Sequence, residues 1–271
     1  LPEKMVLPLK DRSMLIRPAL VLLDAIHTAN WERPLYISAT TGIDEYLDLS
    51  GHLLQEGLVM RIVPYPVKEI PNQADTDRLY RFLLEDVQLE GLDRKNVYLD
   101  ETNRRMLRLV YVTMVETATN LIRRGDTLQA RKLLERYEQL IPKHYLGSEL
   151  SELKARHALW LHRLGHPEEG KALWASTYQA VAQKSLWYNA LNSRLTFGTT
   201  QQMLNNLGMQ YRIMQRGIQL DSSRAATLAA DYLNTLHAIQ RKRTQTGDYQ
   251  TAHILENWIT EIRQPANTPT P

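Results

Sequence analysis

The sequence of 271 residues contains no cysteine. This absence excludes disulfide scaffolds, zinc sites built from thiolates and thiol nucleophiles, and it leaves the cellular compartment open. No apolar run is long enough to span a membrane: the densest, Leu109–Val115, lies between Arg108 and Glu116, whereas a spanning helix needs about 20 apolar residues. Basic residues outnumber acidic ones by only 33 to 30 and are spread along the chain. Nucleic-acid-binding proteins normally concentrate basic residues on one face, so we expect no nucleic-acid partner.

The sequence also lacks the motifs that position reacting groups. It contains neither the G-x-x-x-x-G-K phosphate loop nor the G-x-S-x-G turn of serine hydrolases. His162 and His166 have the spacing of a zinc-binding pair, but no glutamate follows the first histidine and Gly165 interrupts the helix that the pair would need. We therefore expect no catalytic residue, no metal site and no cofactor in this chain.

The first third of the sequence alternates between helical and extended patterns. Pro18 suits a first helical turn, Asn30 tolerates the left-handed conformation that ends helices, and Pro34 favours an extended entry into the next segment. The pattern predicts a helix from Pro18 to Asn30, a strand at Leu35–Ser38, a second helix at Asp44–Gln55 and a strand at Leu58–Pro64. Helix–strand–helix–strand order predicts a small layered α/β unit over residues 1–72.

The remainder of the chain, residues 73–263, has helical periodicity. The segment from Ala118 to Pro142 resembles a tetratricopeptide repeat. Such a repeat has a small residue in each of its two helices, a glycine at the turn and a proline at its end, and the matching residues are Ala118, Ala130, Gly125 and Pro142. Asp126, three residues before Gln129, predicts a capping box at the start of the second helix. We thus expect a mostly α fold of the α+β class, in which the α/β unit precedes tetratricopeptide-like hairpins that stack as an α-α superhelix.

A second copy of this plan spans Glu152–Gln183, with Gly165 at the turn and Gly170 in the slot of Ala130. Later segments carry no clean repeat signature, although Gly247 starts a further turn. The pattern predicts helices at Asp75–Leu89, Ser185–Arg194, Thr200–Arg216 and Ser222–Arg241. Residues 264–271 form a proline- and threonine-rich segment that we expect to be a flexible tail.

Two groups of side chains are candidate binding residues. Trp31, Arg33 and Tyr36 surround Pro34 and would form either a binding site or a structural clasp between helix and strand. A larger aromatic group lies in the helical part and would either pack between helices or line an aromatic groove for a sugar ring or a peptide. Its members are Trp160, Trp174, Tyr178 and Trp187.

Several motifs together resemble the region that follows the membrane helices in a bacterial multi-pass membrane family similar to protein O-mannosyltransferases. They are Leu22-Leu23-Asp24, Asn30-Trp31-x-Arg33-Pro34-x-Tyr36, the segment from Gly57 to Pro64, and Val97-Tyr98-Leu99-Asp100-Glu101-Thr102-Asn103-Arg104-Arg105. The resemblance covers residues 15–182 and beyond them rests on helical character. Glu32 departs from the lysine that members often have before the Arg-Pro pair.

The resemblance implies a non-catalytic accessory domain of a membrane-bound glycosyltransferase. The chain begins with Leu1, and we expect the parent protein to carry membrane helices upstream that use a polyprenyl-phosphate sugar donor. The chain itself would be soluble and would lie on the periplasmic side of the inner membrane. Its partners would be that membrane-embedded part and an acceptor protein or glycan. The alternative is a free-standing helical scaffold that binds a peptide or protein.

Overall fold

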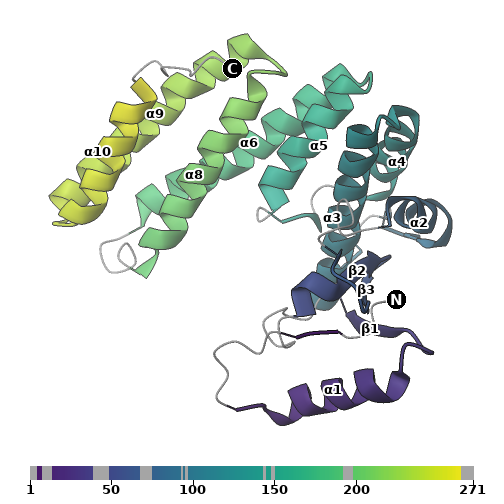
Figure 1. Cartoon of the computed structure of the whole chain (residues 1–271). Coiled ribbons are helices and arrows are strands. Elements are labelled where there is room, and N and C mark those ends of the chain that lie inside the picture. The colour runs from purple at the N-terminus through teal and green to yellow at the C-terminus, as the bar shows by residue number, and fades with distance from the viewer. Residues whose placement is uncertain are drawn as a thin grey trace, which may run out of the picture. The chain divides into compact units, whose positions relative to one another are not determined.

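The computed structural model describes residues 5–7, 14–38, 49–67, 75–92, 94, 97–142, 145–147, 150–191 and 198–263. The chain forms two compact units, residues 1–145 and 146–271 (Figure 1). The first unit contains both a small sheet and the first helical hairpin, and the second is built from helices. The predicted domain limits at residues 72 and 263 stay predictions, and the predicted tail lies outside the described residues. Within the described ranges, no helix is both long and apolar enough to cross a membrane.

Three short strands form an antiparallel sheet in the first unit. They are β1 (Leu35–Ser38), β2 (Leu53–Glu56) and β3 (Val59–Ile62), in the order β1-β3-β2. Gly57 has φ +65° and forms, with Leu58, the two-residue turn between the paired residues Glu56 and Val59. Glycine favours this turn because positive φ carries no steric penalty without a Cβ.

The predicted helix at Asp44–Gln55 is wrong at its C-terminal end. Residues 49–52 form a 3-10 turn, η2 (Leu49–His52), and the next four form β2; residues 39–48 lie outside the described part. The apolar spacing in this short segment fits helix and strand alike. Hairpin pairing across Gly57 stabilises the strand, so glycine serves as the turn of a hairpin and not as a helix stop.

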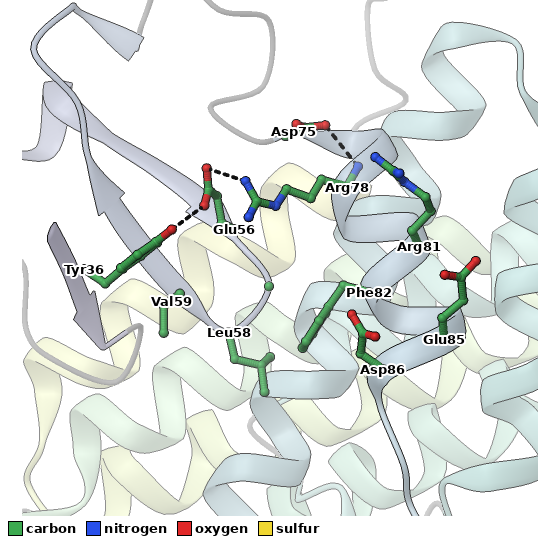
Figure 2. A pocket seen from close by; sticks show the side chains of 11 residues that line it. Tyr36, Glu56, Leu58, Val59, Asp75, Arg78, Arg81, Phe82, Glu85 and Asp86 are labelled. Carbon is green, nitrogen blue, oxygen red and sulfur yellow. Dashed lines mark hydrogen bonds and ion pairs between the residues drawn. The ribbon is translucent and has the colours of Figure 1, made fainter. Parts of the chain in front are cut away.

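One face of the sheet carries a hydrophobic core. Ile37, Leu53 and Ile62 are buried with Leu49, and helix α1 (Arg17–Ala29) packs partly buried side chains against them. Strand side chains alternate between faces, so residues one position away from this core point to the opposite face. That second face carries Tyr36, Glu56, Val59 and Arg61, and it faces helix α2 (Thr76–Arg81; Figures 1 and 2).

Helix α2 (Thr76–Arg81) continues into a π-helix, η5 (Phe82–Asp86). The Asp75 side chain caps α2 by accepting a 3.0 Å hydrogen bond from the amide of Arg78, and the amide of Val87 donates to the carbonyl of Phe82 at 3.1 Å. The predicted helix at Asp75–Leu89 is thus present, but it widens to π geometry after one and a half turns and ends earlier.

The first helical hairpin consists of α3 (Glu101–Arg124) and α4 (Thr127–Leu140). Ala118 and Ala130 are fully buried, and Gly125 ends α3 in the left-handed conformation, φ 90°. The predicted capping box is wrong: Asp126 makes no side-chain cap, and its carboxylate instead accepts a 2.6 Å bond from Arg124. An ion pair with a neighbouring guanidinium has replaced the hydrogen bond to the helix amide.

The second unit is built from α5 (Ser151–Arg163), α6 (Pro167–Ala190), α8 (Thr200–Gly217), α9 (Ser222–Gln245) and α10 (Tyr249–Arg263). The prediction of a separate helix at Ser185–Arg194 is wrong, because α6 runs without a break to Ala190. A Cβ at Gly170 would lie 2.5 Å from the carbonyl oxygen of Ala158 and 2.9 Å from the amide nitrogen of His162, so α5 and α6 approach too closely for any side chain there. Helical hairpins are confirmed; their assignment as tetratricopeptide repeats stays a prediction.

Candidate functional site

A cleft of about 750 Å³ opens between the second face of the sheet and the α2–η5 helix (Figure 2). The strand side contributes Tyr36, Glu56, Leu58 and Val59. The helical side contributes Arg78, Arg81, Phe82, Glu85 and Asp86. Its volume lies within the range of ligand-binding clefts, about 300–1,000 Å³. All of these elements belong to the first unit.

Glu56 is the most buried charged residue of the cleft, with 7% of its surface exposed. Its carboxylate accepts a 3.0 Å hydrogen bond from the hydroxyl of Tyr36 and pairs with Arg78 at 3.0 Å and Arg61 at 3.3 Å. A buried carboxylate is costly unless it is paired and hydrogen-bonded, and three partners meet that requirement here. Because they come from β1, β3 and α2, the carboxylate ties the two sides of the cleft together.

The apolar part of the cleft is fixed by a glycine under an aromatic ring. A Cβ at Gly57 would lie 3.3–3.4 Å from the ring of Phe82. That contact is tight, and the positive φ of Gly57 adds strain for any other residue. Leu58 lies beside this ring in Figure 2, so the hairpin turn supplies an apolar surface next to the polar groups.

The π-helix determines which helical side chains reach the cleft. A π turn inserts an extra residue per turn, and such segments occur frequently at functional sites. Phe82, Glu85 and Asp86 all belong to η5 and line the cleft. The result is a mixed surface of carboxylates, guanidinium groups and one aromatic ring, which can orient a polar ligand by hydrogen bonds.

An ion pair holds α2 in place at its outer side. The guanidinium of Arg124, at the end of α3, binds both carboxylate oxygens of Asp77 at 2.6 and 3.1 Å. These hydrogen bonds and the positive charge lower the pKa of Asp77 below its ordinary value. Both side chains are exposed, so the pair contributes at most about 1 kcal/mol. It orients the helix that carries Arg78 and Arg81.

The structure separates the three candidate residues around Pro34. Trp31 is partly buried and packs against the core on the first face of the sheet, as a clasp would. Arg33 is exposed. Tyr36 is 46% exposed and lines the cleft on the opposite face. The three do not form one site, because the alternation of strand side chains sends Tyr36 away from the core that Trp31 covers.

The aromatic residues of the helical part occupy different environments. Trp174 is fully buried and donates a 2.9 Å hydrogen bond to the carbonyl of Ile213, and Tyr178 is 3% exposed. Both fill space between helices, as the packing alternative requires. Trp160 is half-buried under the guanidinium of Arg163, 5.4 Å from its ring centroid. Trp187 is 54% exposed.

Apart from Tyr36, the side chains that meet in the cleft were not candidates from the sequence. Glu56 falls in a segment whose pattern also fits a helix, and Arg78 resembles any exposed helical arginine. The sequence pattern around Phe82 is that of a core residue in an ordinary helix. One signal was available: Gly57 followed by an apolar run is typical of a hairpin turn as well as of a helix end.

Comparison with known protein families gives a match in the segment that builds the sheet side of the cleft. Residues 1–79 match the family model for TMEM260-associated domain 2. The matched segment includes α1, the whole sheet and the start of α2, and therefore Tyr36, Glu56 and Arg78. No curated protein and no solved structure matches the chain.

The match covers less than a third of the chain. It makes this first part similar to a domain associated with a membrane protein. It carries no indication of protein O-mannosyltransferases, so that finer resemblance stays a prediction.

Proposed function

We propose that this chain is the extracytoplasmic accessory domain of a membrane-bound glycosyltransferase similar to protein O-mannosyltransferases. It is not itself catalytic; it holds the acceptor near a membrane-embedded site that uses a polyprenyl-phosphate sugar donor. The match of residues 1–79 to a domain associated with a membrane protein supports the membrane attachment. The motifs at Asn30–Tyr36 and Gly57–Pro64 support the glycosyltransferase context.

The observation that carries the proposal is the position of the cleft. Its sheet side is built from two of the motifs of the resemblance, since Tyr36 ends one and Gly57 begins the other. Tight turn geometry and the Phe82 contact account for Gly57, and the hydrogen bond to buried Glu56 accounts for Tyr36. A motif that builds a cleft can carry binding specificity, because folding alone does not require that open space.

The chemistry of the cleft favours a polypeptide acceptor. Arg81, Glu85 and Asp86 are exposed and offer charges of both signs along one side. Charges of both signs orient a polar chain, because each selects a complementary side chain. Phe82 and Leu58 add the apolar contact that anchors such a chain. Transfer chemistry is left to the membrane-embedded part.

The topology of the complete protein tests this proposal. The gene that encodes this chain is read upstream of Leu1, and its product is fused at the C-terminus to alkaline phosphatase or to a fluorescent protein that folds only in the cytoplasm. We expect upstream membrane helices, an active phosphatase fusion and a dark fluorescent fusion. A reading frame without membrane helices, or a fluorescent fusion with inactive phosphatase, contradicts the proposal.

A further inference from the structure

A second cleft, of about 250 Å³, lies between α8, α9 and α10 in the second unit. Its lining includes three aromatic residues, a glycine and two charged residues: Tyr211, Tyr232, Trp258, Gly208, Arg212 and Glu261. None of the four aromatic residues singled out from the sequence belongs to this lining. Its volume is close to that of a single six-membered sugar ring or one large side chain.

The aromatic surface of this cleft is rigid. The rings of Tyr211 and Tyr232 are stacked with centroids 5.8 Å apart at 25°. Tyr232 is 1% exposed and its hydroxyl donates a 2.9 Å hydrogen bond to the carbonyl of Leu207. Burial raises the pKa of this hydroxyl, so it stays protonated and keeps the bond. Trp258, on α10, is half-buried and adds a third ring.

Gly208 is a glycine that the fold of α8 does not require. It lies inside α8, where glycine is less favourable than alanine by about 1 kcal/mol. Its φ is not positive, and among the described residues a Cβ at this position would meet only the Nη1 tip of Arg212, at 3.3 Å. Neither a turn nor a close helix approach requires glycine here. The missing side chain leaves open the space of the cleft.

The two charged residues offer a donor and an acceptor. Nε and Nη2 of Arg212 both bind one carboxylate oxygen of Glu152, at 2.8 and 2.5 Å. This pairing offsets the charge of Arg212 and occupies the edge that would grip an anion. Nη1 lies 3.3 Å from the Cβ position of Gly208, and Arg212 lines the cleft. Glu261 is exposed and supplies acceptor oxygens on α10.

From these observations we infer that the second cleft binds a neutral pyranose ring. The apolar C–H face of the ring would lie on Tyr211 and Trp258, the two partly exposed rings of the cleft, while buried Tyr232 supports Tyr211 from behind. Its hydroxyl groups both donate and accept hydrogen bonds, so they can pair with Arg212 and with Glu261 at once. An anionic ligand fits less well, because Glu152 already holds the guanidinium. The inference does not depend on the proposed function.

Ligand titration of the whole chain tests the inference. The probes are the methyl glycosides of glucose, galactose, mannose and N-acetylglucosamine. Saturation-transfer NMR and calorimetry measure their binding. We expect at least one to bind saturably. Gly208→Leu, which fills the cleft, and Glu261→Gln, which weakens its acceptor, should each lower the affinity at least about tenfold, or about 1.4 kcal/mol.

Two variants serve as matched controls. Gly198→Leu adds the same side chain at an exposed glycine with no described atom within 4 Å of its Cβ position, and it should leave the affinity unchanged. Glu256→Gln removes the charge of an exposed residue on the same helix as Glu261 that does not line the cleft, and it should also leave the affinity unchanged. Glu261 is exposed, so its variant keeps the affinity test valid even if Gly208→Leu lowers the melting temperature.

Three outcomes overturn the inference. One is the absence of saturable binding by any of the four glycosides. Another is binding that Gly208→Leu and Glu261→Gln leave intact, which puts the ligand elsewhere. The third is binding of N-acetyltyrosinamide without binding of the glycosides, which makes the cleft a pocket for a peptide side chain.

Discussion

Replacing Trp31 by glycine and by alanine separates its packing from its backbone conformation. Trp31 has φ +62°, a region that costs residues with a Cβ about 1–2 kcal/mol and glycine almost nothing. Both substitutions remove the indole that packs on the sheet core, so the loss of packing cancels between them. We expect both to destabilise the fold, because deletion of a buried aromatic side chain costs about 3–5 kcal/mol and somewhat less where it is partly exposed.

The difference in stability between the two variants then measures the cost of the positive φ at position 31. Glycine is usually less stable than alanine by about 0.5–1 kcal/mol, but at Trp31 the order should reverse, with glycine more stable by about 1 kcal/mol. The same pair of substitutions at Asp24, an exposed position inside α1, should show the ordinary order. Urea unfolding of the four variants measures these differences. Alanine more stable than glycine at position 31 would refute the argument.

Four further substitutions test other parts of the account. Gly170→Ala should lower the stability by about 1–3 kcal/mol, because its Cβ meets backbone atoms of α5. Gly208→Ala should be neutral or stabilising by up to about 1 kcal/mol. Equal melting temperatures for the two variants would contradict this difference. Gly57→Ala should lower the stability by about 1–2 kcal/mol, because of the positive φ at this position, and should displace Phe82. An unchanged urea midpoint would argue against the left-handed turn at Gly57. Asp77→Asn should cost at most about 1 kcal/mol at pH 7. The native pKa of Asp77 is lowered, so this stabilisation is present above the unfolded-state pKa of about 3.9 and is lost as the pH falls through the native value. A difference in stability that does not shrink as the pH is lowered below the unfolded-state pKa would contradict the pair.

The helical part of the fold could be predicted because its signals are local. Gly125 marks a chain reversal, and Ala118 and Ala130 mark a helix contact too close for larger residues. Each acts within one hairpin and leaves a fixed spacing in the sequence. The strand at Leu53–Glu56 was missed because short apolar segments fit both periods until pairing with β3 decides between them.

The cleft could not be predicted, because it depends on segments far apart in the sequence. Glu56 acquires its role from Tyr36 and Arg78, 20 residues before it and 22 after it. The π-helix that carries Phe82 has no sequence signature that distinguishes it from an α-helix. Long-range packing hides other positions too: a Cβ at Gly217 would lie 1.9 Å from the ring of Trp174, a contact that neither residue reveals alone.

The most direct test of the proposed function measures acceptor dependence in the complete protein. Membranes from cells that express the whole gene receive a radiolabelled polyprenyl-phosphate mannose donor and increasing amounts of extracted envelope protein. Arg81→Ala and Glu85→Gln alter exposed residues of the cleft, and Arg33→Ala alters an exposed residue outside it. We predict a higher KM for the protein acceptor in the two cleft variants, unchanged kcat, and no change for Arg33→Ala. Absence of transfer by the unaltered protein, or equal KM values in all variants, would contradict the account.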